Sequence, residues 1–289
     1  PNDKQGPAGY DSSKGFIRDD KLFTYTIHFE NVDSATASAL KVVVTDTLDN
    51  DLDLSTFSFD GTSHPSFLTA TLDTVNRVVT WTFDGIELPP NVIPPEGEGW
   101  CRFVVHPRPG LSTGTQVKNR ADIIFDYNDP LVTNIVTNTI DNSPPTSNVV
   151  SLPDTTHTGQ FLVCWTGTDG SSGSGIKSYD VYVQYDSGGY SPWLLGTTDT
   201  GAVFVGQNER VHSFYSVATD NVGLREAVPL IPSTQTVVTG VASPILNLPA
   251  NGSYTNNVTP TFGWSRSAGT GGSYVLQVAR DSVFVDTLW

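Results

Sequence analysis

The sequence predicts an all-β protein built from tandem antiparallel β-sandwiches, the last of which is incomplete. Apolar and polar residues alternate with a period of two in many short segments, as they do in strands that bury one face. The chain has 26 Gly and 19 Pro, which gather in polar clusters that end strands. Of its 30 acidic residues 24 are Asp, which favours turns over helices. No window has a convincing helical period.

Alternating apolar side chains predict four strands in the first half of the chain. Their inward sets are Phe23, Tyr25, Ile27 and Phe29; Leu40, Val42 and Val44; Val79, Trp81 and Phe83; and Val117, Ala121, Ile123 and Phe125. Between them we expect turns at "DNDLD" (49–53), "FDGTSHP" (59–65) and "PPNVIPPEGEG" (89–99), because Gly and Pro interrupt a strand ladder. After the turn "DYNDP" a last strand is expected from Leu131 to Ile140.

Composition shifts divide the chain into three predicted domains, residues 1–142, 143–240 and 241–289. The first boundary is the proline-containing run "DNSPPTS" (141–147). The second and third segments share a layout in which a strand with Trp165 or Trp264 precedes one with Tyr179 or Tyr274. The third holds roughly three strands, too few to close a sandwich. Three explanations are open for the missing strands: the chain is a fragment cut within this domain, the given sequence covers only part of the domain, or another chain supplies the strands.

Charge and composition exclude several classes of partner. The net charge is −15 and the pI is about 4.4, which argues against nucleic acid and anionic membranes. No apolar stretch is long enough for membrane insertion, and the chain has no Met, so we expect an internal piece of a longer exported polypeptide. Cys101 and Cys164 fall in different predicted domains, and their spacing indicates neither a disulfide framework nor zinc.

Motifs that carry catalysis are weak in this sequence, and we predict no catalytic residue. Asp186-Ser187-Gly188 and Asp199-Thr200-Gly201 resemble protease elements, but they lie in one small predicted sandwich and are read as turns. The five histidines have no metal or catalytic spacing. The run "DNDLD" places aspartates as an EF-hand loop does, but Leu54 replaces the required Gly, so a plain acidic turn is favoured.

The second segment resembles a bacterial fibronectin type III domain. Trp165 stands where that family has its second-strand Trp, Tyr179 where it has a third-strand aromatic, and "FYSVATDNVG" (214–223) is similar to its sixth strand and following loop. One position differs from the family pattern, because His212 stands where the family usually has the Tyr of the tyrosine corner. The third segment resembles the opening of another such domain. The resemblance implies an immunoglobulin-like sandwich.

The first segment resembles the conserved-repeat domains of large bacterial surface and secreted proteins, a group without an assigned activity. The pieces that match are "PNDKQGPAGY", "YTIHFENV", "VVVTDTLDNDLDLSTF", "WTFDGIELPP" and "NRADIIFDYNDPLVTNIVTNTI". Together the resemblances cover nearly the whole chain. They imply a fold and leave the activity open.

The loop placement that the resemblance to fibronectin type III domains implies leads to the hypothesis of a calcium site. In that arrangement the loops after the second and sixth strands share a pole, which brings Asp169 near Asp220 and Asn221, and Asp141 from the linker joins them. Calcium needs six to eight oxygen ligands, and clustered carboxylates otherwise repel. The alternative is that Asp220 and Asn221 shape a turn before Gly223. A second candidate pole for a metal consists of Asp3, Asp126, Asn128 and Asp129.

These observations predict a non-catalytic structural or adhesive segment of a large secreted or cell-surface bacterial protein, acting as a stalk, spacer or protein-interaction module that calcium stiffens. Expected partners are neighbouring domains of the same polypeptide and a glycan or another surface protein. The alternative is an accessory or carbohydrate-binding module of a secreted hydrolase, for which Tyr190 and Trp193 would form the ligand platform. Apart from calcium no cofactor is expected.

Overall fold

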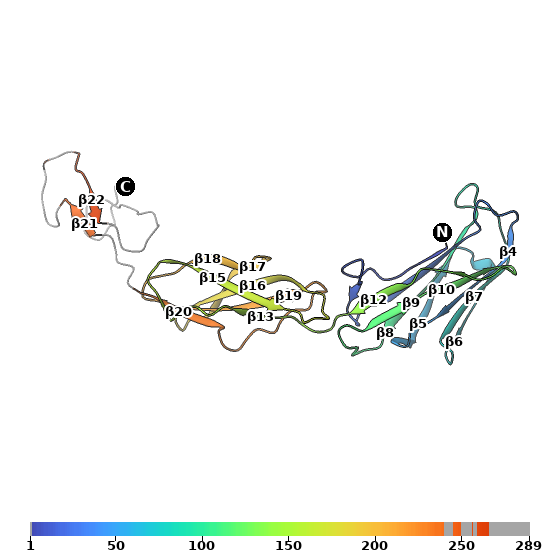
Figure 1. Cartoon of the computed structure of the whole chain (residues 1–289), viewed down its shortest axis with the longest axis horizontal. Helices are drawn as coiled ribbons and strands as arrows, with labels where there is room; N and C mark the ends of the chain where they lie inside the picture. Colours follow the sequence, from blue (N-terminus) through green and yellow to red (C-terminus); the bar gives the residue numbers. More distant parts are fainter. Residues whose placement is uncertain (1, 240–244, 250–255, 257–258, 266–289) are drawn as a thin grey trace. The chain divides into compact units, whose positions relative to one another are not determined.

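The computed structural model describes residues 2–239, 245–249, 256 and 259–265, and within them the all-β prediction is confirmed (Figure 1). This part of the chain has one short 3-10 turn, η1 (Pro65–Phe67), and contains no helix long and apolar enough to cross a membrane. The chain divides into two compact units. Unit 1 comprises Pro1–Thr146, Thr168–Lys177 and Thr219–Glu226, and unit 2 comprises Ser147–Gly167, Ser178–Ala218 and the residues from Ala227 onward.

Two sheets form the main body of unit 1. The first has the order β1-β3-β8-β5, with β1 Asp3–Gln5, β3 Phe23–Glu30, β8 Glu98–Pro107 and β5 Leu52–Thr62. The second has the order β11-β10-β4-β7-β6, with β11 Leu131–Val132, β10 Ala121–Phe125, β4 Ala39–Thr47, β7 Val78–Leu88 and β6 Leu68–Asp73. All pairings within these two sheets are antiparallel.

The inward faces of these sheets supply one continuous core. In β3 every second residue from Phe23 to Phe29 is fully buried, and β7 and β8 repeat this alternation around Trp81 and Phe103. The ring centroids of Trp81 and Phe103 lie 5.8 Å apart. Because each buried large apolar side chain contributes about 1.5–3 kcal/mol relative to exposure, this core is the main source of stability in unit 1.

The predicted strand from Leu131 to Ile140 is wrong, because the chain changes sheets within it. Leu131–Val132 (β11) pairs with β10, whereas β12 (Val136–Ile140) pairs with β9 (Gln116–Asn119) and with β2 (Phe16–Ile17) in a third sheet, β2-β12-β9. Thr133 marks the break: its N–H donates to the Ala121 carbonyl oxygen, and its Oγ1 accepts from the Ala121 N–H. Hydrogen bonds between Thr133 and Ala121 therefore end the first short strand and let the chain cross to another sheet.

The expected turns at "DNDLD" and "FDGTSHP" are only partly correct, because β5 runs from Leu52 through Thr62. This strand pairs with β8 in an interrupted register, and Gly61 has a φ of 112°, so bulges rather than a full turn accommodate the polar run. Asp49 and Asp53 accept hydrogen bonds from neighbouring backbone N–H groups, as in an acidic turn.

Unit 2 contains most of a second sandwich. Its sheets have the orders β13-β15-β18 and β14-β20-β19-β16-β17. The bounds are β13 Thr146–Val149, β14 Thr155–Thr156, β15 Gln160–Thr168, β16 Ile176–Tyr185, β17 Tyr190–Thr197, β18 Gly201–Val205, β19 Val211–Asp220 and β20 Thr234–Val238. The core includes Trp165, Phe214 and Val217, all fully buried. Unit 2 is thus also built from two sheets around a buried core, with fewer strands than unit 1.

The side chain of His212 makes a hydrogen bond to the backbone a few residues upstream. Its ring is fully buried, and Nε2 accepts a hydrogen bond of 3.0 Å from the backbone N–H of Gln207, five residues upstream. A tyrosine corner likewise ties a side chain to the backbone a few residues upstream. In this chain the anchoring atom is an imidazole nitrogen, whereas a tyrosine corner uses a phenolic oxygen.

Most of the predicted third domain, 241–289, lies outside the described residues. Its described part includes a two-stranded sheet of β21 (Ile245–Leu248) and β22 (Gly263–Ser265). The predicted repeat residues Tyr274, Leu276 and Val278 lie outside the described residues.

Candidate functional site: three buried aspartates

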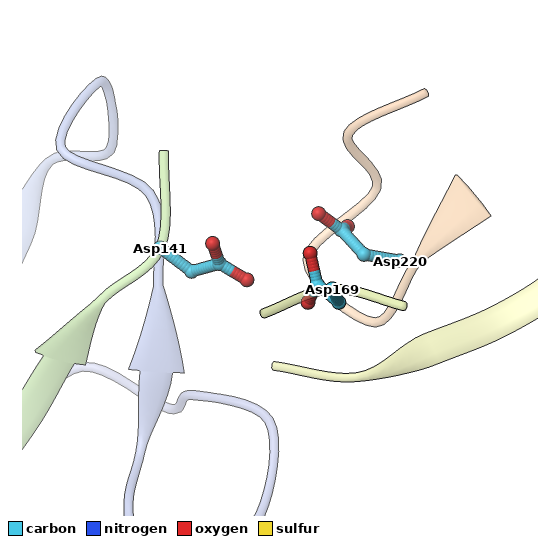
Figure 2. Close-up of side chains that lie close together, drawn as sticks. All are labelled: Asp141, Asp169 and Asp220. Carbon is cyan, nitrogen blue, oxygen red and sulfur yellow. The ribbon is translucent and has the colours of Figure 1, made fainter. Parts of the chain in front are cut away.

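Three aspartates that directly follow or end strands come together within unit 1. Asp141 follows β12, Asp169 follows β15, and Asp220 is the last residue of β19. Strand ends place side chains at the rim of a sandwich, where loops meet. Figure 2 shows the three carboxyl groups pointing toward one another. The structure thus gathers the three acids that the sequence analysis assigned to one cation site.

The spacing of these carboxylates suits a single hard cation. One oxygen from each of the three side chains lies within 4.8 Å of the others. Calcium binds oxygen at about 2.3–2.6 Å, so two ligands on opposite sides of one ion are separated by about twice that distance. The side chains are also withdrawn from water, with exposed fractions of 0% for Asp141 and Asp220 and 7% for Asp169. Within the described part of the chain, no other group of three or more acidic, His or Cys side chains meets this spacing.

Two of the carboxylate oxygens are buried without a hydrogen-bond partner. Asp220 accepts from the N–H groups of Val222 and Leu224 through Oδ1, while its Oδ2 has no partner. Asp169 accepts from the Gly175 N–H at 2.7 Å through Oδ2, while its Oδ1 has no partner. A buried unpaired polar atom costs roughly 1–3 kcal/mol, so these oxygens favour a ligand that pairs with them.

The loop after Asp169 is shaped around the cluster. Ser174 donates its backbone N–H to Asp141 Oδ2 at 2.7 Å, and the Ser174 Oγ is buried without a partner. A Cβ on Gly173 would overlap the carbonyl oxygen and the carboxyl group of Asp169, so only glycine allows this close approach. An open depression lined by residues that include Thr113 and Asp169 borders the cluster and gives an ion a path of entry.

Asn221 supports the loop through its amide nitrogen. Its Nδ2 donates to the carbonyl oxygens of Ser174 and Gly175, at 3.0 and 2.9 Å. Asp220 also shapes the turn before Gly223, which has a φ of 88°, through the two N–H groups that it accepts. The turn before Gly223 therefore uses Oδ1 of Asp220 and leaves Oδ2 available for a cation.

Electrostatics make the cluster unfavourable in its fully ionised, metal-free form. Burial raises the pKa of Asp169, and the nearby charge of Asp141 adds to this, although the hydrogen bond from the Gly175 N–H opposes it. Burial likewise raises the pKa of Asp220, with additional repulsion from Asp141 and Asp169 and an opposing hydrogen bond from the Leu224 N–H. A cation bound between these oxygens would offset both the cost of burying the charges and their mutual repulsion.

The four residues of the second candidate metal pole do not form a comparable cluster in the structure. The side chain of Asp126 is already an acceptor for the backbone N–H groups of Leu40 and Lys41, and Asn128 and Asp129 are exposed. Asp3 lies in β1 opposite His28. Metal binding by this set stays a prediction.

Tyr190 and Trp193 are both half-buried and engaged by core rings. Trp193 packs edge-on against Phe204, with ring centroids 5.1 Å apart, and it also contacts Trp165 and Phe214. Tyr190 packs against Tyr215 at 4.6 Å. A ligand platform on these residues stays a prediction, because the described contacts account for both rings as packing.

The sequence analysis missed a buried polar cluster in unit 1, formed by Lys4, Asp46 and Asn119. Asp46 lies two and four positions after the inward residues Val44 and Val42, so it is on the same face of β4. An acidic residue on the inward face was a signal that the sequence offered. Lys4 lies in a strand of three residues, too short to display a period, so nothing in the sequence marked it as buried.

Comparisons with known proteins add a family match and distant structural likenesses. A family model described as a domain of unknown function, DUF7619, matches residues 1–139. No curated protein is similar enough to the chain to count as a match.

Several solved structures of bacterial proteins are similar to the chain. The major pilin subunit BcpA of Bacillus cereus is 14% identical over 82% of this chain and 68% of that one, with a TM-score of 0.37. The C-terminal domain of the antigen I/II-family protein AspA of Streptococcus pyogenes is 10% identical over 81% and 99%, with a TM-score of 0.40. The C-terminal domain of the AgI/II polypeptide BspA of Streptococcus agalactiae is 13% identical over 82% and 98%, also at 0.40. TM-scores of 0.37 to 0.40 indicate only a distant likeness.

Proposed function

We propose that the chain is a non-catalytic structural module of a secreted or cell-surface bacterial protein, and that calcium stabilises it. The observation that carries the proposal is the cluster of Asp141, Asp169 and Asp220, with two buried carboxylate oxygens that lack a partner. Such a site uses charge to hold segments together, without a nucleophile or a proton donor aimed at a substrate.

Calcium is the cation that these ligands favour. All the candidate ligand atoms are oxygens, which suits hard cations, and calcium accepts the irregular and variable coordination that loops provide. Magnesium requires near-ideal octahedral geometry at shorter distances and gives up its waters reluctantly. Extracellular calcium modules typically bind with dissociation constants of roughly 10⁻⁴–10⁻³ M, so a site of moderate affinity suffices outside the cell.

The mechanical consequence follows from where the ligands lie in the sequence. Asp141 ends the predicted first domain, whereas Asp169 and Asp220 belong to loops of the predicted second domain. A cation held by all three would fasten these three segments, which are distant in sequence, to one another within unit 1. We therefore propose a role as a stalk, spacer or protein-interaction segment, with the neighbouring domains of the polypeptide as its first partners.

Two finer assignments belong to the same proposal. The buried Trp165, the corner bond of His212 and the three- and five-stranded sheets of the second sandwich support a fibronectin type III-like domain. The first sandwich, with its long alternating strands and acidic loops, is proposed to be a conserved-repeat surface domain. The acidic composition, with a net charge of −15, would keep a series of such domains soluble and mutually repelling.

Thermal unfolding of the full chain with calcium and with a chelator tests the proposal. At calcium a hundredfold above the dissociation constant we expect about 2.7 kcal/mol of stabilisation. This corresponds to an increase of several degrees in Tm, since 1 kcal/mol shifts Tm by roughly 2–4 °C for 150–250 residues. Magnesium at the same concentration should have a smaller effect.

The control is Asp33→Asn, which removes one exposed acid far from the cluster in sequence. This variant should keep the full calcium response, whereas Asp169→Asn should lose it. Equal melting curves with calcium and chelator for the unaltered chain would refute the calcium site. A calcium response that Asp169→Asn retains would assign the binding to other acids.

A further inference from the structure

A second cluster, inside unit 1, brings a lysine amine, a carboxyl group and a carboxamide together away from water. Lys4 lies on β1, Asp46 on β4 and Asn119 on β9, and their exposed fractions are 2%, 1% and 2%. The three strands belong to three different sheets. A covalent bond within this cluster would therefore connect separate layers of the unit.

The contacts of Asp46 link the other two side chains. Lys4 Nζ donates to Asp46 Oδ2 in a very short contact between fully buried side chains. Asn119 lies close enough to the same carboxyl group to lower its pKa, although neither polar atom of the carboxamide has the geometry of a hydrogen bond. The Oδ1 of Asp46 also lacks a partner. Asp46 thus lies between an amine and a carboxamide.

Aromatic rings enclose the amine. Lys4 Nζ lies 4.7 Å from the ring centroid of Tyr25 and 5.2 Å from that of Phe103, and these two rings stack with centroids 5.1 Å apart. Both aromatic side chains are fully buried. Such surroundings exclude the water that would otherwise solvate an ammonium group or hydrolyse an acyl intermediate.

A permanent buried ion pair is the plain alternative, and the unpaired atoms argue against it. Buried ion pairs compensate for desolvation only when further hydrogen bonds satisfy the remaining donors and acceptors. Here both polar atoms of Asn119 and one oxygen of Asp46 lack partners. Burial lowers the pKa of Lys4 and raises the pKa of Asp46, so the environment favours a neutral amine beside a neutral acid.

We propose that Lys4 Nζ condenses with the side-chain carboxamide of Asn119 to form an intramolecular isopeptide bond, with Asp46 as the proton shuttle. The neutral amine attacks Asn119 Cγ, and protonated Asp46 donates to the carboxamide as the tetrahedral centre forms. The Cγ–Nδ2 bond then breaks. The leaving nitrogen departs as ammonia, and the proton lost by Lys4 Nζ returns Asp46 to its starting state, so the reaction needs no oxidant, nucleotide or cofactor.

Asn119 is favoured as the acyl group over Asp46 because that assignment gives each of the three side chains a role. If Asp46 were the acceptor, a hydroxyl group would have to leave, and the neighbouring carboxamide cannot supply the proton that this requires. With Asn119 as acceptor, Asp46 contacts the nucleophile and carries the proton to the leaving group.

The bond would anchor a segment that is otherwise weakly held. β1 has three residues and lies at the edge of its sheet, so few ladder hydrogen bonds hold it. Hydrogen bonds between Asn134 and the backbone of Lys4 fix its register but are reversible. A link from Lys4 to Asn119 would prevent β1 from peeling away under force or thermal fluctuation.

Intact mass spectrometry of the full chain, folded and then denatured, tests the proposal. We expect a mass lower than that of the sequence by one ammonia. Trypsin should then fail to cleave after Lys4 and should release residues 1–14 joined to the dipeptide 119–120. A folded chain with the unreduced mass overturns the proposal, and a loss of one water overturns Asn119 as the acceptor.

Variants assign the three roles. Lys4→Arg and Asn119→Ala should retain their full calculated masses, and Asp46→Ala should react at least tenfold more slowly or not at all. Asn119→Asp should still react but lose one water, because a carboxyl group then replaces the carboxamide. Lys14→Arg, at an exposed lysine, is the matched control and should lose one ammonia like the unaltered chain. Mass loss in either Lys4→Arg or Asn119→Ala would refute the assignment.

Discussion

The backbone N–H of Ser174 donates to Asp141 Oδ2 at 2.7 Å, and this hydrogen bond connects residues that are 33 positions apart in the chain. The next N–H, that of Gly175, donates to Asp169. One short loop therefore satisfies one oxygen of each of two acids and leaves Asp169 Oδ1 and Asp220 Oδ2 unpaired. Hydrogen bonds hold the three side chains in place, while these two oxygens remain without a partner.

Asp220→Asn is expected to affect the metal-free and calcium-bound proteins in opposite directions. An amide at position 220 can keep Oδ1 as acceptor for Val222 and Leu224, and its new Nδ2 donor replaces the unpaired Oδ2. Without calcium the variant should melt at the same temperature as the unaltered chain or a few degrees higher, because one repelling charge is gone. With calcium it should show little or no gain. A lower calcium-free Tm together with an intact calcium response would contradict this expectation.

The pH dependence of calcium-free stability should follow the raised pKa values of Asp169 and Asp220. A carboxyl group whose pKa is higher in the folded than in the unfolded state binds protons more tightly when folded, so its contribution to stability decreases as pH rises. The loss begins near the ordinary carboxyl pKa of about 4 and is complete above the raised values. Calcium should counteract it, so the calcium-induced increase in Tm should grow with pH across this window. Melting curves from pH 4 to 8, with calcium or chelator, measure both slopes. The double variant Asp169→Asn with Asp220→Asn should lose the part of each slope that these two acids contribute.

Gly173→Ala should destabilise the cluster through steric overlap alone. The added Cβ would collide with the backbone oxygen and carboxyl group of Asp169, and part of that contact is rigid main chain. We expect a loss of roughly 1–3 kcal/mol, as for other overpacked sites, and a weaker calcium response. Gly159→Ala is the matched control, since a Cβ there meets open space. Equal stability of the two variants in urea unfolding would show that the loop is free to move away from Asp169.

The sequence predicted the strands and the three acids, and it failed where tertiary contacts decide. Alternation located β3, β4 and β7 because each buries one face along its length. Asp169 and Asp220 were predicted to meet because both lie where a strand ends at one pole. The single strand expected from Leu131 to Ile140 was wrong, since hydrogen bonds between Thr133 and Ala121, which lie 12 positions apart, redirect the chain.

The contribution of Ser174 could not be read from the sequence, because it acts through a backbone N–H that any residue other than proline would supply. The pairing of Lys4 with Asp46 was hidden for a related reason, namely that the two lie in different sheets 42 positions apart. The only local sign of this pairing was that Asp46 lies on the inward face of its strand. Sequence patterns thus show which face of a strand a residue occupies, whereas its contacts depend on the sheet that packs against that face.

The buried imidazole of His212 should make unit 2 less stable in mild acid. Burial lowers the pKa of His212, and its Nε2 must be unprotonated to accept from Gln207. A histidine whose pKa is lower when folded stabilises the protein above the unfolded pKa of about 6.5, and this contribution is lost as pH falls below that value. His212→Gln offers an acceptor that does not titrate and should reduce this pH dependence, whereas His157→Gln, at an exposed histidine, should preserve it. Identical pH profiles for the two variants would show that His212 is not the titrating group.

Trp193→Ala separates packing from ligand binding. The ring is half-buried against Trp165, Phe204 and Phe214, so its removal should lower the free energy of unfolding by roughly 2–3 kcal/mol, somewhat less than for a fully buried Trp. Tyr127→Ala removes a fully exposed ring and should change stability by less than about 0.5 kcal/mol. Urea unfolding of unit 2 measures the first effect, and a glycan array probed with both variants examines the alternative role. Glycan binding that Trp193→Ala abolishes while the domain stays folded would favour a carbohydrate-binding module, because packing alone does not predict a lost ligand.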